Sequence, residues 1–126
     1  MFTVFHIRCG SKAEIKAIAK DFSESSFFSN FNPELVEDLR LSLDISTKNL
    51  VSEHFDEITS FLNALNNWFD NLDNSSHFKF SLDTAIEPDD LRGCNLLEIP
   101  TPKNVLNIAS KLNIELLMTI YPPSLE

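Results

Sequence analysis

The sequence predicts an α/β (α+β) fold, a single-domain two-layer sandwich with a mixed sheet of about five strands and three helices. Three observations predict it. Apolar residues alternate with period two in several short runs, they recur every three or four residues in others, and the 126 residues include only two glycines. The runs follow one another in the order β-α-β-α-β-β-α-β. A chain of this length buries enough apolar surface for one core, so we expect one globular domain over residues 1–126.

The chain begins with a strand followed by a helix. Phe2–Cys9 is an apolar, β-prone run that stops at Gly10. Ser11 and Glu14 have the spacing of a capping box, in which the serine caps the helix and the glutamate reaches back to it. A helix is therefore expected from Ser11 to about Phe22.

The next segment combines a polar loop with a strand. The loop, residues 23–32, carries three phenylalanines, and Asn32 followed by Pro33 predicts a short helical turn. Asp38–Ser46 then alternates strictly between apolar and polar side chains, which predicts a strand with one wet face. The loop phenylalanines are Phe27, Phe28 and Phe31. Two interpretations stay open for them: they cap the core, or they form an aromatic anchor for a partner.

The longest element is a helix predicted over about Lys48–Leu72. Its apolar side chains are spaced alternately by four and three residues. They are Val51, Phe55, Ile58, Leu62, Leu65, Phe69 and Leu72. Such a stripe suits packing on a sheet or pairing in a coiled coil. Packing on a sheet is favoured because the chain has no second heptad helix, so Ile58, Leu62 and Leu65 should lie at the centre of the core.

Three short segments follow the long helix. His77–Asp83 alternates like a strand, residues 87–93 have the pattern of one helical turn, and Asn95–Ile99 predicts a short strand. From residue 38 on, the predicted order is β-α-β-β-α-β, which is that of a ferredoxin-like unit.

The last helix and strand complete the fold. Thr101 is the expected N-cap of the helix, with Pro102 at its first position and Asn113 at its end. Ile114–Tyr121 is a near-continuous apolar run, typical of a strand that is covered on both faces.

The charge of the chain is strongly asymmetric. Nineteen acids against ten bases give a net charge of −9, and residues 21–91 alone carry −12 whereas residues 1–20 carry +3. Such an acidic segment disfavours direct contact with nucleic acid or an anionic membrane, because both need lysine and arginine. It favours a basic protein partner. The alternative is that the acids only keep the protein soluble.

The sequence carries no catalytic signature, which predicts a protein that is not an enzyme and holds no cofactor or metal. Two glycines are too few for a P-loop or a dinucleotide fingerprint, and the three histidines lack the spacing of metal ligands. Cys9 and Cys94 are far apart and lack the spacing of a zinc site. Two buried thiols are favoured over a disulfide between them, because a chain without a signal peptide is expected in a reducing compartment. The first residues lack a basic region and a cleavage site, so we expect a cytoplasmic protein.

The residues expected to contact the partner are the clustered acids, with loop phenylalanines as apolar anchors. They are Glu53, Asp56, Glu57, Glu87, Asp89, Asp90, Phe27 and Phe28. The expected oligomeric state is a monomer.

The chain resembles the small immunity proteins of bacterial toxin systems, especially those of contact-dependent growth inhibition. The resemblance lies in a single acidic α/β domain of this length without a catalytic motif, with seven lysines against three arginines and no glutamine. It implies a cytoplasmic protein that neutralises one cognate toxin, a basic nuclease domain, by direct binding. The alternatives are a phage-type DNA mimic of the anti-restriction or anti-CRISPR kind, and a small ferredoxin-like enzyme with an unrecognised site.

Overall fold

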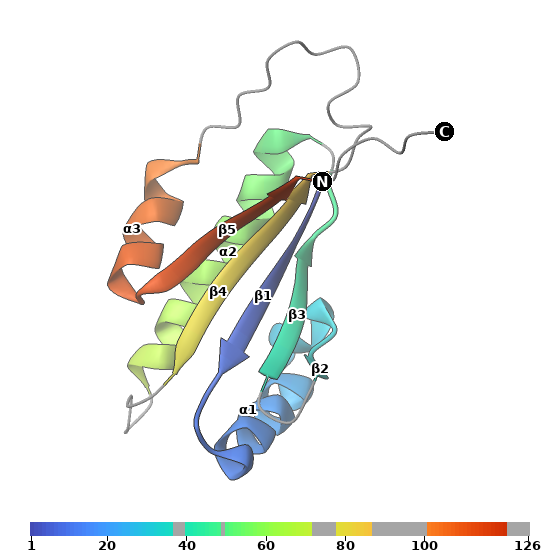
Figure 1. Cartoon of the computed structure of the whole chain (residues 1–126), viewed down its shortest axis with the longest axis vertical. Coiled ribbons are helices and arrows are strands. Elements are labelled where there is room, and N and C mark those ends of the chain that lie inside the picture. The colour runs from blue at the N-terminus through green and yellow to red at the C-terminus, as the bar shows by residue number, and fades with distance from the viewer. Residues whose placement is uncertain (37–39, 49, 72–77, 87–100, 121–126) are drawn as a thin grey trace.

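The computed structural model describes residues 1–36, 40–48, 50–71, 78–86 and 101–120, and it confirms the α/β class (Figure 1). In these residues, three α-helices and one 3₁₀ helix accompany a mixed five-stranded sheet. The strands are β1 (Phe2–Arg8), β2 (Glu34–Leu35), β3 (Arg40–Ser46), β4 (Lys79–Ile86) and β5 (Ile114–Ile120). The helices are α1 (Lys12–Glu24), the 3₁₀ helix η1 (Phe28–Phe31), α2 (Val51–Asp70) and α3 (Lys103–Lys111).

The N-terminal strand lies in the middle of the sheet, whose order is β2-β3-β1-β4-β5. β1 runs antiparallel to both neighbours, whereas β4 and β5 are parallel. The ferredoxin-like unit predicted from residue 38 on is wrong for the described strands, because in that unit β5 would pair with β3, whereas here β5 pairs with β4 and β1 lies beside β3. The described part of the chain has the order β-α-β-β-α-β-α-β. The turn predicted at residues 87–93 and the strand predicted at Asn95–Ile99 lie outside the described residues.

The core lies between one face of the sheet and the helices, and in Figure 1 α2 passes behind the strands. Side chains alternate along the strands as predicted, so Phe5 and Leu43 are buried on the helix side. The α2 stripe packs on this face, where Ile58, Leu62 and Leu65 are fully buried, as predicted. Because the stripe is buried inside the chain, it does not serve as a coiled-coil seam. We call the other side of the sheet the open face.

The helix ends follow the capping signals in part. The Glu14 backbone N–H donates a hydrogen bond of 3.3 Å to the Ser11 hydroxyl, which confirms Ser11 as the N-cap of α1. At α3, Pro102 and not Thr101 occupies the N-cap position, so the helix starts one residue later than predicted. Asn113 has a φ of 54°, the left-handed conformation expected of the residue that ends the helix.

Two other segments differ from the prediction. Asn32, with a φ of 50°, closes η1, and the chain then pairs with β3 as the short strand β2 instead of starting a helical turn. β5 is not covered on both faces, because it lies at the edge of the sheet and no second layer covers the open face within the described residues. Its middle and C-terminal side chains are largely exposed.

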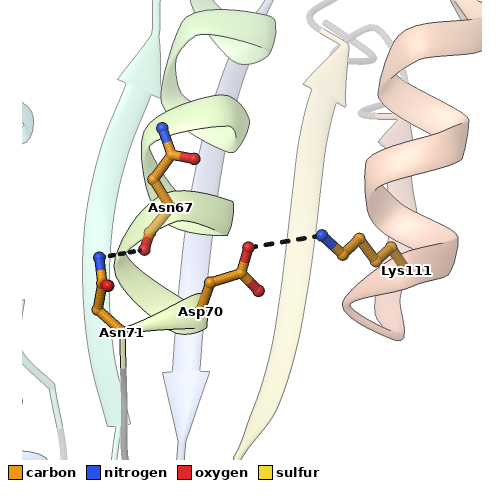
Figure 2. Close-up of polar contacts among 4 residues, drawn as sticks. All are labelled: Asn67, Asp70, Asn71 and Lys111. Atoms are coloured by element: carbon orange, nitrogen blue, oxygen red, sulfur yellow. Dashed lines mark hydrogen bonds and ion pairs between the residues drawn. The ribbon is translucent and has the colours of Figure 1, made fainter.

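The C-terminal ends of α2 and α3 are linked at the surface (Figure 2). Lys111 Nζ lies 3.6 Å from Asp70 Oδ2, and the Asn71 side-chain amide donates a 2.9 Å hydrogen bond to the carbonyl oxygen of Asn67. Both charged side chains are more than half exposed, so this ion pair contributes at most about 1 kcal/mol to stability.

Among the described helices, none is both long enough and apolar enough to cross a membrane.

Candidate functional site

The acids predicted to bind a partner form a row along α2. Glu53, Asp56, Glu57 and Ser60 are separated by three and four residues, which places them on one side of the helix. The glutamate at 53 and the aspartate at 56 are exposed. Glu57 is half-buried and accepts a 3.0 Å hydrogen bond from the Ser46 hydroxyl at the end of β3. This bond fixes one carboxylate of the row against the sheet.

Phe31 brings an aromatic ring to this row of acids. A hollow of about 240 Å³ is lined by Phe31, Asp56, Glu57 and Ser60. A second hollow, of about 370 Å³, shares Phe31 and Glu57 with the first and extends to Asp44 of β3. We call Phe31, Asp44, Asp56 and Glu57 the acidic–aromatic face. Within the described residues, none of its three carboxylates forms an ion pair with a lysine or arginine.

The loop phenylalanines divide between the two interpretations. Phe28 is only 7% exposed and stacks on Phe22 with ring centroids 4.3 Å apart, so it is a core residue and its predicted contact role is wrong. Phe27 is 36% exposed and meets Phe31 edge to face at 5.1 Å. Phe31 also packs on the buried Phe61, again at 5.1 Å, which holds its ring in place beside the acids.

Sequence reasoning missed one member of this face, Asp44, which the sequence pattern places only on a wet strand face. Phe31 is one of the three loop phenylalanines that the sequence offers as an aromatic anchor, although only Phe27 and Phe28 are among the predicted contacts. One feature of the sequence could have placed Asp44 near the acids of α2. Only residues 47–50 separate the end of β3 from the start of α2, which keeps the two ends close together. Glu87, Asp89 and Asp90, the other predicted contacts, lie outside the described residues.

The open face carries a histidine at its centre. His6 Nδ1 lies 2.9 Å from the Ser42 hydroxyl of the neighbouring strand. Burial of the ring and the positive charge of Arg40 lower the pKa of His6 from its ordinary value of 6.5; Asp83 raises this pKa, and Arg8 lowers it further. The imidazole is therefore held in its neutral form at neutral pH.

This environment predicts a pH-dependent term in stability. Because the pKa of His6 is lower in the folded chain, the unfolded chain binds more protons as the pH falls through 6.5 towards the folded value. The stability associated with neutral His6 is lost over that window. Chemical unfolding of the parent and of His6→Gln, measured on both sides of the window, should show a steeper loss for the parent. Equal losses in the two proteins would contradict the prediction.

The described residues offer no group of side chains placed to hold a metal ion. No three histidine, cysteine, aspartate or glutamate side chains lie together in the described ranges as metal ligands would. His54 is fully buried and hydrogen-bonded to Thr3, which makes it a core residue. Cys9 is a buried free thiol, as predicted. No protein-family model, no curated protein and no solved structure matches the chain.

Proposed function

We propose that the protein is a non-catalytic inhibitor that binds a basic protein partner through the acidic–aromatic face. The observation that carries this proposal is the position of Phe31, whose side chain lines one hollow with Asp56 and Glu57 and a second hollow with Asp44 and Glu57. Interface contacts that dominate binding combine an aromatic or arginine anchor with surrounding polar groups. A lysine or arginine of the partner can pair with the acids while its aliphatic stem rests on the ring.

The partner class that fits best is a basic toxin domain, and the protein is then a cytoplasmic immunity protein. The net charge of −9 draws a basic partner towards it over long range, which raises the association rate. The Phe31 ring and the hollows give this face a specific shape that can fit one partner, which a general DNA mimic does not need. A mimic instead requires carboxylates spaced along one long face like phosphates, whereas the carboxylates here line hollows together with an aromatic side chain.

The test compares two charge reversals of equal size. Asp56→Lys changes the acidic–aromatic face, and Asp21→Lys makes the same change at an exposed position of α1. The proposal implies that a neighbouring gene encodes the toxin, and the purified toxin domain of that gene is the probe. We expect Asp56→Lys to weaken its binding about tenfold or more and to reduce the salt dependence of the affinity, with Asp21→Lys close to the parent.

Two outcomes would count against the proposal. Equal affinities and equal salt dependences for both variants would show that this face is not the interface. Displacement of DNA from several unrelated DNA-binding proteins by the parent would favour the DNA mimic instead.

A further inference from the structure

The sheet has two edges of very different character. The edge formed by β2 is only two residues long, and a short edge strand offers little to another chain. The edge formed by β5 is seven residues long, and within the described residues no strand pairs with its outer side. It contains one charged residue, Glu115, and no proline. The usual devices that protect an exposed edge strand are therefore nearly absent from β5.

β5 also exposes apolar side chains, three on the helix side and one, Leu117, between Glu115 and Thr119 on the open face. Leu116 is 42% exposed, Met118 52% and Ile120 58% on the helix side, and Leu117 is 42% exposed on the open face. Beside this strand lies a hollow of about 140 Å³, lined mainly by apolar side chains that include Phe55 of α2. The helices leave space under β5 that an apolar side chain of a neighbouring strand can enter.

We propose that two copies of this chain pair through β5, in antiparallel register, about a two-fold axis at Leu117. A two-fold axis perpendicular to the sheet keeps the helices of both copies on one side. The seven residues of each strand then pair along their full length, and opposed side chains point to the same face. The sheet continues from one copy into the other, and the β5 edge of each copy is covered.

The sequence of β5 is complementary to itself in this register. Leu116 lies opposite Met118 of the second copy, so the exposed apolar side chains of the helix side join into one stripe. On the open face, Glu115 lies opposite Thr119 of the second copy, and Leu117 lies opposite itself. No like charges are opposed, although each chain carries −9 overall. This self-complementarity is why a second copy is the occupant that fits best.

The pairing involves few side chains, so the dimer is weak. A single strand pair buries less than the roughly 1,600 Å² of a standard interface, which points to a dissociation constant in the micromolar range. Added salt should favour this dimer, because it screens the repulsion between two acidic chains while leaving the apolar contact intact. Added salt should weaken the binding of a basic partner but strengthen self-association. The two proposals are therefore tested by separate measurements, and the failure of one does not imply the failure of the other.

The experiment is sedimentation equilibrium of the full chain over a wide range of concentrations. We expect the parent to approach twice its monomer mass as its concentration rises. Leu117→Lys places two like charges face to face at the two-fold axis and should weaken self-association about tenfold or more. The matched control is Leu106→Lys on α3, because Leu106 is 44% exposed and Leu117 is 42% exposed. Leu106→Lys should self-associate like the parent.

Ile120→Lys tests the same edge with a second variant, in case Leu117→Lys does not fold. It should also remain monomeric where the parent is dimeric. A parent that stays monomeric at every concentration would overturn the proposal. That result would hold even if another segment or another protein covered the outer edge of β5. Dimers of unchanged affinity in both folded β5 variants would overturn it as well.

Discussion

Replacement of Leu62 by alanine is expected to lower the free energy of unfolding by about 2–5 kcal/mol. Leu62 is fully buried in the middle of α2, between Ile58 and Leu65 in the stripe that packs on the sheet. The loss combines the transfer free energy of the removed methyl groups with the cavity that remains. Typical domains are stable by only about 5–15 kcal/mol, so the melting temperature should fall visibly.

The matched control is Glu53→Ala on the exposed side of the same helix. Glu53 lies on the wet face of α2, so its removal should change stability by less than about 0.5 kcal/mol. Thermal and urea unfolding of both variants and the parent, at matched low concentrations where the chain is monomeric, provide the comparison. If Leu62→Ala melted like the parent, the assignment of Leu62 to the centre of the core would be wrong.

The elements that the sequence predicted well are those with a long and regular pattern. The stripe of α2 repeats through the whole helix, so its period alone identifies the buried side. The sequence of β3 alternates strictly, and its three apolar residues, Leu41, Leu43 and Ile45, are all buried. Ser11 caps α1 because capping depends on residues only three positions apart. In each of these cases the deciding interaction is local or periodic.

The features that the sequence did not predict depend on contacts between distant segments. β1 takes the central position in the sheet, which local pattern cannot reveal. The apolar run of β5 is typical of a doubly covered strand, yet a strand at an edge, ready for a second chain, has the same composition. Phe28 and Phe31 are three residues apart in one loop, but only tertiary packing decides that one is buried and the other borders the acids.

The candidate site was also predictable only where it depends on a local pattern. The spacing of Glu53, Asp56 and Glu57 is enough by itself to identify one acidic side of a helix. The addition of Asp44 required the position of β3 beside α2, and the role of Phe31 required its contact with Phe61. Charge patterns along a helix are thus visible in a sequence, whereas the choice of Phe31 among the three loop phenylalanines depends on tertiary packing.

Replacement of His54 by alanine is the second change with a large expected effect. His54 is fully buried; its Nδ1 lies 2.9 Å from the carbonyl oxygen of Lys48, and its Nε2 lies 2.6 Å from the Thr3 hydroxyl. A carbonyl oxygen only accepts, so Nδ1–H donates to Lys48, and Nε2 of the neutral ring accepts from Thr3. The Thr3 oxygen, 2.8 Å from the Thr84 hydroxyl, in turn accepts from Thr84. This chain of hydrogen bonds joins α2 to β1 and β4.

Loss of the imidazole should lower the free energy of unfolding by about 3–5 kcal/mol. Each buried polar group that loses its partner costs about 1–3 kcal/mol, and the removed ring leaves a cavity in addition. Urea unfolding of His54→Ala at neutral pH measures this loss. A loss below about 1 kcal/mol would show that the site relaxes around the missing ring and that the chain of hydrogen bonds contributes little.

Two substitutions at Thr3 separate the hydrogen bonds from the packing. Thr3→Val keeps the shape of the side chain and removes the hydroxyl, which leaves His54 Nε2 and the Thr84 hydroxyl without their shared partner. Thr3→Ser keeps the hydroxyl and removes one methyl group, at a cost of about 1 kcal/mol. If the hydrogen bonds hold α2 on the sheet, Thr3→Val should be the less stable variant, with a loss of about 2–3 kcal/mol in urea unfolding. If packing dominates instead, the order reverses and Thr3→Ser is the less stable of the two.

Because α2 carries Asp56 and Glu57, we expect Thr3→Val also to weaken partner binding, by displacing the acidic–aromatic face without altering any of its residues.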